Sequence, residues 1–223
     1  MRKALGVLGA VVFCGCAAAE EAPQVHQPVT VALIGDSIFY GVWIPNRAEE
    51  TIEGYLDGML SEEDTVLNYA VPGAALQSDA DQPYVNEPAY RKSLQCGADY
   101  YIILLGTNDA TPYNWNKERF AAEYRTFLQT YIDLTDKDHV CAVIPPQVYE
   151  DEQTHYVNYS VMPDALYEET AVIREAAEEA GVQCVDLYTL TKNHPEWFWD
   201  GVHPNKDGNR AIAEEIYRCM FTE

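Results

Sequence analysis

The sequence predicts an α/β fold, a three-layer α/β/α sandwich built on a five-stranded parallel sheet. Short apolar runs alternate with longer amphipathic segments along the whole chain, which is the pattern of repeated strand-helix-strand units. The runs are continuously apolar, as expected of strands that are buried on both faces. With 223 residues, the chain is long enough for one domain with a sizeable core and short for two.

Five runs rich in Val, Ile, Leu and Tyr are the predicted strands. They cover residues 29–34, 65–69, 99–105, 139–144 and 182–187. The less regular stretches 73–88, 111–115, 145–162 and 189–200 follow the ends of strands two to five. Since the carboxyl ends of parallel strands share one edge, we expect these loops to form a substrate rim on that edge.

Five amphipathic segments are the predicted helices. They cover residues 47–60, 87–94, 116–134, 163–180 and 206–221. In the third, Phe120, Tyr124, Phe127, Leu128 and Tyr131 recur at helical spacing and predict one core-facing stripe. The fourth opens with Pro163 and stops before Gly181, as a proline in the first turn and a glycine after the last turn should.

Residues 1–19 have the basic start, apolar run and small-residue end of a secretory signal peptide. Cleavage after Ala19 satisfies the small-x-small rule. Gly15 before Cys16 also resembles an imperfect lipoprotein box, so a membrane tether through a lipidated Cys16 and a freely secreted protein both stay open. We expect an exported protein, either secreted, periplasmic or held at the cell surface, with residues 20–223 as a single domain.

The formal net charge is −22. Such a surface repels phosphate backbones and anionic lipid headgroups, which disfavours nucleic acid as a partner and favours a neutral substrate.

Four cysteines lie beyond residue 19, namely Cys96, Cys141, Cys184 and Cys219. Export permits disulfides, with three possible connectivities, but small buried thiols are equally compatible with their apolar surroundings. No C-x-x-C or H-x-x-x-H spacing suggests zinc.

Ser37 follows the first predicted strand in Gly35-Asp36-Ser37, where ligands collect in open α/β sheets. A serine hydroxyl needs an imidazole to take its proton, and the imidazole works best when a carboxylate holds its other nitrogen. His203 precedes the last predicted helix, and Asp200 lies three residues before it. Taken alone, this segment is equally an ordinary turn that leads into a helix.

Two further loops offer donors for an oxyanion. Gly73 follows the second predicted strand and lets a backbone amide approach a substrate closely. Asn108 follows the third and supplies a side-chain amide. With the backbone amide of Ser37 they make three donors for a tetrahedral intermediate. The alternative is that each glycine only makes a turn.

Together these four segments resemble the SGNH hydrolases, the GDSL-like esterase and lipase superfamily. The blocks Gly35 to Ile38, Gly73, Gly106 to Asp109 and Asp200 to His203 appear in the family's order. The one departure is Ile38, where the family has leucine. No Gly-x-Ser-x-Gly elbow is present, so the chain is not read as an α/β-hydrolase.

The resemblance implies the SGNH hydrolase fold, with a flavodoxin-like parallel sheet. It implies Ser37 as nucleophile, His203 as general base and acid, and Asp200 as its orienting carboxylate. Ser37, Gly73 and Asn108 would be the oxyanion donors. It implies neither a metal nor another cofactor.

Other residues near the motifs have two interpretations. Asp36 and Asp109 would, with Asp200, hold a divalent cation in a phosphoesterase, but acids at strand ends more commonly accept hydrogen bonds from loop amides. Six aromatic residues flank the motif loops as a sugar platform, an acyl pocket or simple packing: Trp43, Tyr84, Tyr113, Trp115, Trp197 and Trp199. Four histidines without motif context are expected on the surface or in turns: His26, His139, His155 and His194.

We therefore expect an exported serine esterase that works through an acyl-serine intermediate. The aromatic loops and the acidic surface favour short-chain, acetyl esters of carbohydrate. A lysophospholipase or other lipid esterase, an O-acyltransferase with the same triad, and a binding module without catalysis are the alternatives.

Overall fold

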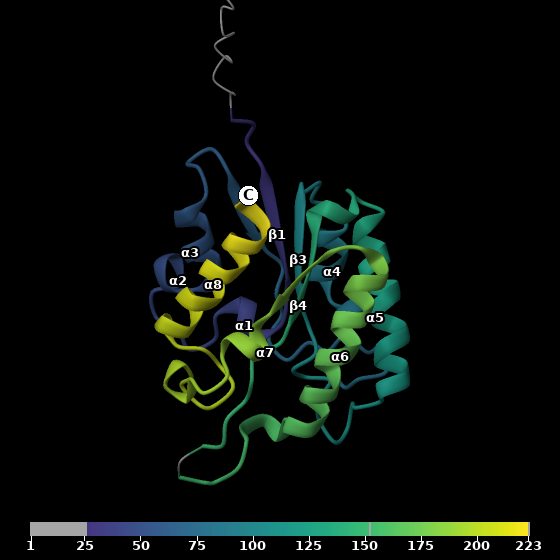
Figure 1. Cartoon of the computed structure of the whole chain (residues 1–223), viewed down its shortest axis with the longest axis vertical. Helices are drawn as coiled ribbons and strands as arrows, with labels where there is room; N and C mark the ends of the chain where they lie inside the picture. Colours follow the sequence, from purple (N-terminus) through teal and green to yellow (C-terminus); the bar gives the residue numbers. More distant parts are fainter. Residues whose placement is uncertain (1–25, 152, 223) are drawn as a thin grey trace, which may run out of the picture.

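The fold is described from a computed structural model (Figure 1), which describes residues 26–151 and 153–222. The predicted signal segment 1–19, with Cys16, lies outside the described residues. Within the described part of the chain, no helix is long and apolar enough to span a membrane.

The sheet has five parallel strands in the order β2-β1-β3-β4-β5. Their bounds are β1 Thr30–Gly35, β2 Thr65–Asn68, β3 Tyr100–Leu104, β4 Val140–Ile144 and β5 Gln183–Asp186. All five predicted strands are confirmed, with small shifts at their ends. Every residue of β4, and all but the first of β1 and β3, are buried, which explains why these runs are continuously apolar.

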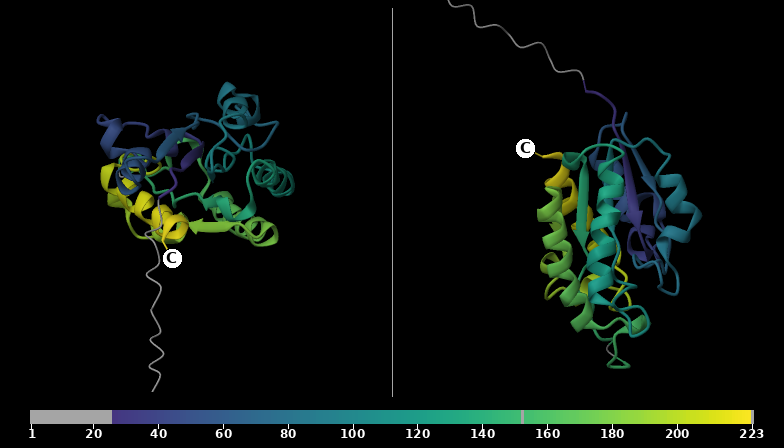
Figure 2. Two further views of the ribbon diagram at one scale, coloured as in Figure 1. Left: turned by 90° about the horizontal axis from the view of Figure 1, so that it is seen from above. Right: turned by 90° about the vertical axis from the view of Figure 1, so that its right-hand side faces the viewer.

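Helices cover both faces of the sheet (Figures 1 and 2), so the predicted three-layer sandwich is confirmed. One face carries α2 (Arg47–Glu50), α3 (Ile52–Met59) and α8 (Lys206–Phe221), and the other carries α4 (Pro88–Ser93), α5 (Lys117–Ile132) and α6 (Pro163–Ala180). Short helices α1 (Ser37–Tyr40) and α7 (Leu187–Leu190) follow β1 and β5, and the 3-10 turns are η1 (Tyr84–Asn86), η2 (Lys137–His139), η3 (Asn158–Ser160) and η4 (Pro195–Trp197).

The two faces of the sheet build separate cores because strand side chains alternate in direction. Val31 and Leu33 of β1 join the core beneath α3 and α8, whereas Ala32 and Ile34 join the core beneath α5 and α6. The predicted apolar stripe of α5 is confirmed as the buried face of the helix, since all five of its residues are buried: Phe120, Tyr124, Phe127, Leu128 and Tyr131. Gly181 ends α6 in the left-handed conformation, with φ of 69°, as predicted.

The prediction of one continuous helix over residues 47–60 is wrong, because Thr51 divides it into α2 and α3. Thr51 is extended, with φ −89° and ψ 165°. Its hydroxyl accepts a hydrogen bond from the Gly54 amide at 3.1 Å and donates to the Arg47 carbonyl at 2.7 Å. A threonine that caps the second helix thus ends the first, which hydrophobic spacing alone does not reveal.

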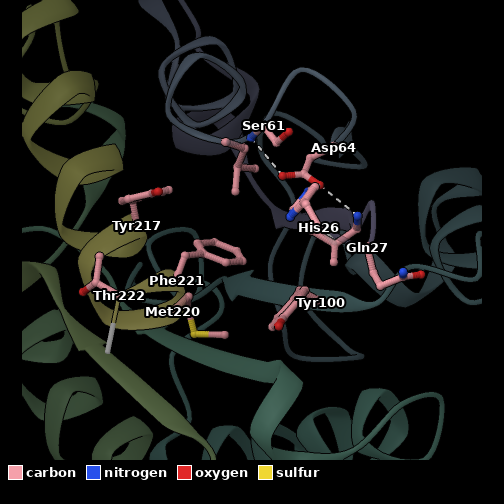
Figure 3. A pocket seen from close by; sticks show the side chains of 11 residues that line it. His26, Gln27, Ser61, Asp64, Tyr100, Tyr217, Met220, Phe221 and Thr222 are labelled. Atoms are coloured by element: carbon pink, nitrogen blue, oxygen red, sulfur yellow. Dashed lines mark hydrogen bonds and ion pairs between the residues drawn. The ribbon is translucent and has the colours of Figure 1, made fainter. Parts of the chain in front are cut away.

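The two edges of the sheet differ in what lies on them. The loops that follow the strands lie at the lower end of Figure 1, whereas the C-terminus lies at the upper end. A cavity of about 590 Å³ lies at the upper edge, between the amino ends of β1 to β3 and the end of α8. Figure 3 shows its lining, in which Asp64 accepts hydrogen bonds from His26 at 2.8 Å and from the Ser61 amide at 2.9 Å. This cavity is remote from every predicted catalytic residue.

The four cysteines of the described chain, Cys96, Cys141, Cys184 and Cys219, are free thiols. Of the two possibilities that the sequence leaves open for them, the structure shows unpaired cysteines.

Candidate active site

Ser37 is the first residue of α1, directly after β1, and so lies at the carboxyl edge of the sheet. The Asp36 side chain caps this helix by accepting a hydrogen bond from the Ile38 amide at 2.9 Å. Gly35 lets the end of β1 lie close to β3, since a Cβ on residue 35 would be 2.9 Å from the Leu104 carbonyl oxygen. The short helix ends at Gly41, with φ of 75°. The serine is therefore fixed between a buried strand and a single capped turn.

Ser37, His203 and Asp200 form one hydrogen-bonded chain. Ser37 Oγ lies 2.9 Å from His203 Nε2, and His203 Nδ1 lies 2.7 Å from Asp200 Oδ2. Because an ionised carboxylate can only accept, Nδ1 carries the proton and Nε2 is left to accept from the serine hydroxyl. The other Asp200 oxygen accepts the backbone amides of Val202 and His203 at 3.0 and 2.7 Å, so the turn itself holds the carboxylate in place.

The environment of Asp200 favours its ionised form. Burial alone raises the pKa of this carboxyl, but hydrogen bonds from the side chain and backbone of His203 outweigh burial and hold the pKa well below its ordinary value. Asp200 therefore remains charged at neutral pH and orients the imidazole.

The predicted oxyanion donors lie together beside the serine. Ser37, Gly73 and Asn108 all line one cavity. Among the described residues, the amides of Ser37 and Gly73 donate to no protein acceptor, so both are available to a substrate. The Asn108 side-chain amide is already engaged, since it donates to the Ala74 carbonyl at 2.9 Å and to Asp36 at 3.3 Å. The longer of these two bonds is the one that an oxyanion would most easily replace.

Tyr159 is a residue of the site that the sequence analysis does not single out. Its hydroxyl donates to Asp200 Oδ2 at 2.9 Å, and its ring stands edge-on to the His203 imidazole, with centroids 4.9 Å apart. The backbone holds it at an unusual φ of 58°. The available signal was its place in the irregular, tyrosine-rich stretch 145–162, which follows the fourth strand.

Three buried carboxyls lie behind the catalytic edge. Burial raises the pKa of Asp36 to about 6, although the Ile38 amide and His203 oppose it. Burial likewise raises the pKa of Asp109 to about 7, against hydrogen bonds from the amides of Leu76 and Gln77 at 2.7 and 2.8 Å. The expectation that acids at strand ends accept loop amides is confirmed for Asp109, whereas the backbone amide that Asp36 accepts, from Ile38, belongs to α1. Glu169 is fully buried, neither carboxyl oxygen has a hydrogen-bond partner, and burial raises its pKa far above the ordinary value.

Across residues 26–151 and 153–222, no group of three or more His, Cys, Asp or Glu residues is arranged to hold a metal ion. In particular, both carboxyl oxygens of Asp109 accept backbone amides, whereas Asp36 accepts the Ile38 amide with one oxygen and the Asn108 side-chain amide with the other.

Two adjoining cavities surround the triad. The inner one, about 290 Å³, contains Ser37 and His203 and has an apolar wall of Val42, Pro72, Val161 and Val202. The outer one, about 410 Å³, is lined by Trp43, Pro45, Tyr159, Trp199 and Asp200. Trp43 and Tyr159 line both, so the two cavities adjoin along these two side chains.

Of the six aromatic residues that flank the motif loops, some pack against other side chains and others are exposed. Tyr84 and Trp115 pack in the core, Trp197 stacks on His194 with centroids 3.9 Å apart, and Tyr113 is exposed away from both cavities. Trp43 and Trp199 line the outer cavity. The histidines without motif context lie outside the triad: His26 pairs with Asp64, His139 contacts Tyr100, His155 lies in a loop, and His194 pairs with Glu196.

A serine hydroxyl bonded to an imidazole that a carboxylate holds, at the carboxyl edge of a parallel sheet, is the arrangement of a serine hydrolase. Comparison with known proteins specifies the family. The GDSL-like Lipase/Acylhydrolase family matches residues 33–211, which include all the predicted site residues. The chain therefore belongs to this family of carboxylic-ester hydrolases, and the resemblance seen in its motifs is confirmed.

Individual relatives agree with this assignment. An acetylxylan esterase from Xylanibacter ruminicola is 30% identical over 215 residues, covering 86% of this chain and 43% of that protein. The chain thus spans less than half the length of that relative. Two solved structures share the fold. A carbohydrate acetylesterase from Sinorhizobium meliloti has a TM-score of 0.68 and 17% identity, and the match covers 84% of this chain and 96% of that one. An acetylxylan esterase from Geobacillus stearothermophilus has a TM-score of 0.67 and 19% identity, and the match covers 87% of this chain and 95% of that one.

Proposed function

We propose that this protein is a serine esterase that removes short acyl groups, above all acetyl, from carbohydrate. The observation that carries the proposal is the chain from Ser37 Oγ through His203 to Asp200, with distances of 2.9 and 2.7 Å. These distances allow a proton to move from the serine to the imidazole without any rearrangement.

The proposed reaction has two halves. Ser37 Oγ attacks the ester carbonyl and gives its proton to His203 Nε2, while the amides of Ser37 and Gly73 and the side chain of Asn108 stabilise the oxyanion. The carbon–oxygen bond to the alcohol then breaks, and His203 returns the proton to the leaving alcohol. In the second half, a water molecule gives a proton to His203 and attacks the acyl-serine carbonyl. The bond between the acyl carbon and Ser37 Oγ then breaks, His203 returns the proton to Oγ, and the carboxylic acid leaves.

The size of the inner cavity and the relatives support a short acyl group. At about 290 Å³, the cavity is at the small end of ligand sites, which are roughly 300 to 1,000 Å³. The similar proteins named above are described as acetylxylan and carbohydrate acetyl esterases, which supports acetylated carbohydrate as the substrate class.

Substitution of the nucleophile tests the reaction. Ser37→Ala removes the attacking oxygen, and we expect hydrolysis of p-nitrophenyl acetate to fall by about 1,000-fold or more while the melting temperature changes little. A Ser37→Ala protein with more than a tenth of the wild-type rate would contradict the proposal.

Two further measurements separate the alternatives. A series of p-nitrophenyl esters of increasing chain length should peak at acetate, whereas a maximum at long chains would indicate a lipid esterase. Product analysis in the presence of sugar acceptors should show free acetate, and predominant transfer to the sugar would indicate an acyltransferase.

We also infer export from the signal-like segment 1–19, with lipidation at Cys16 as the alternative to cleavage after Ala19. Mass spectrometry of the protein recovered from culture supernatant and from membranes distinguishes the two, because only the tethered form carries acyl chains on Cys16.

A further inference from the structure

We propose that the outer cavity, the aromatic cleft of Trp43, Pro45, Tyr159, Trp199 and Asp200, binds a pyranose ring of a neutral glycan next to the sugar that carries the ester. This inference rests on the proposed function and adds a carbohydrate subsite to it. Three features of the cleft support it: two exposed indoles, the attachment of these indoles to the segments that hold the triad, and the negative charge around them.

The two indoles are unusually exposed for such large apolar side chains. Trp43 and Trp199 keep 64% and 59% of their surface accessible, although tryptophan is among the side chains most stabilised by burial. Trp43 also has a backbone φ of 66°, which is rare for a bulky residue and costs free energy. Exposed apolar surface of this kind, set in a cleft, is typical of a ligand site.

Both indoles are attached to the segments that hold the triad. Trp43 follows Ser37 by six residues, just beyond the end of α1. The Trp199 amide donates to the His203 carbonyl at 2.9 Å, so this residue is fixed to the turn that contains Asp200. A ring seated between Trp43 and Trp199 therefore has a defined position relative to Ser37.

The cleft also adjoins the cavity that contains the nucleophile. Trp43 and Tyr159 line both the aromatic cleft and the cavity that holds Ser37 and His203. A polymer lying in the cleft can therefore place an acetylated neighbouring unit at the serine. A small aryl acetate lacks the neighbouring sugar ring that the cleft would bind.

The charge around the cleft selects a neutral ligand. No lysine or arginine lines either cavity, and Asp200 is held ionised. The cavity on the far side of Trp199 adds Glu150, Asp151 and Glu196. A phosphate headgroup would meet only like charge here. A pyranose fits better, because its C–H faces can stack on indoles while its hydroxyl edges donate to carboxylates.

The first test compares substrates in Trp199→Ala, because Trp199 lines the aromatic cleft but not the inner cavity. We expect its kcat/KM on acetylated xylooligosaccharides to fall about 2-fold to 13-fold more than on p-nitrophenyl acetate, which is the effect of losing one stacked aromatic ring. Trp199→Phe should recover part of the loss. Tyr113→Ala is the matched control, since Tyr113 is 85% exposed and lines neither cavity, and it should behave as wild type on both substrates.

The second test measures binding without catalysis. Calorimetry of Ser37→Ala with deacetylated xylohexaose should show saturable binding, and the double variant Ser37→Ala, Trp199→Ala should bind at least fivefold more weakly. This arm still decides the subsite if the wild-type protein hydrolyses no ester, so failure of the proposed function is distinguishable from failure of the cleft.

Three results would overturn the subsite. Equal losses on the oligosaccharide and the aryl ester in Trp199→Ala would mean that Trp199 only supports the triad turn. A loss confined to p-nitrophenyl octanoate would indicate an acyl-chain site. A loss confined to acetylcholine would indicate a site for a quaternary ammonium group, which aromatic rings also bind.

Discussion

The carboxyl of Asp200 and the carboxyls behind the catalytic edge are the same chemical group in two opposite states. Asp200 is partly exposed and receives hydrogen bonds from the imidazole and two backbone amides, and its pKa is lowered. Asp36, Asp109 and Glu169 are fully buried, and their pKa values are raised. Burial raises the pKa of every one of them, and Asp109 stays raised although the amides of Leu76 and Gln77 donate to it. Asp200 differs because it is only partly buried and because His203 donates to it from both its side chain and its backbone, so partial exposure and these donors together keep it charged.

Among changes to these four carboxyls, the largest expected effect comes from removing the charge of Asp200. Asp200→Asn keeps the shape of the side chain but presents an amide to His203 Nδ1, which favours the imidazole tautomer that cannot accept from Ser37. We expect kcat/KM on p-nitrophenyl acetate to fall by about 100-fold to 10,000-fold. A loss of less than threefold would show that the His203 orientation does not depend on this carboxylate.

Removal of Asp109 should mainly affect stability. Asp109→Ala leaves the buried amides of Leu76 and Gln77 without acceptors, which costs about 2–5 kcal/mol of the free energy of unfolding. Urea denaturation followed by tryptophan fluorescence measures the loss. Asp109→Asn retains one acceptor oxygen and should lose less, and equal losses in the two variants would argue against this account.

Glu169→Gln should make stability less dependent on pH. In the unfolded chain this carboxyl ionises near its ordinary pKa of 4.5, whereas burial keeps it protonated in the folded chain. The unfolded state then binds fewer protons above that pH, so the free energy of unfolding falls as the pH rises. Asp36 and Asp109 also lower the free energy of unfolding as the pH rises. Asp36 does so between pH 3.8 and about 6, and Asp109 between pH 3.8 and about 7.

We therefore expect Glu169→Gln to melt at about the wild-type temperature at pH 4 and several degrees above wild type at pH 8. Each kcal/mol gained in the free energy of unfolding should raise the melting temperature by about 2–4 °C. Differential scanning calorimetry at the two pH values measures this gain. Glu178→Gln, on the exposed side of the same helix, is the control and should show no such difference. A Glu169→Gln protein that is destabilised equally at both pH values would disprove the ionisation account.

The smallest expected effect is that of Tyr159→Phe. The variant loses one hydrogen bond to Asp200 but keeps the ring edge against His203, so kcat/KM should fall about fivefold, equivalent to roughly 1 kcal/mol. Steady-state kinetics with p-nitrophenyl acetate are sufficient to detect it. A decrease as large as that of Asp200→Asn would mean that the tyrosine, and not the turn, positions the carboxylate.

Local signals predicted most of the fold and the triad. Pro163 and Gly181 mark the ends of α6 because their backbone preferences act within one turn. Ser37, Asp200 and His203 were predicted because each sits in a short motif at a strand or helix end, although the structure alone shows that Ser37 and His203 meet at 2.9 Å.

Features that depend on particular side-chain contacts, whether local or distant, were not predicted. The break at Thr51 depends on a side-chain hydrogen bond that competes with a continuous helix. From the sequence alone, Glu169 looks like another acidic residue on the surface of a helix, yet it lies on the buried side of α6. Its carboxyl packs so closely against Gly106 that a Cβ on residue 106 would lie 2.5 Å from one of its oxygens. Tyr159 gains its partner only because the loop after β4 folds over a turn 41 residues away.

The cavity at the upper edge of the sheet has a practical consequence for handling the protein. His26 and Thr222 both line it, so the two ends of the folded body lie side by side, at the opposite edge from Ser37. A resin or a fusion partner joined at either end would leave the catalytic edge facing free solution. Immobilisation there should preserve access for a polymer, whereas attachment through the loops after β4 or β5 would obstruct it.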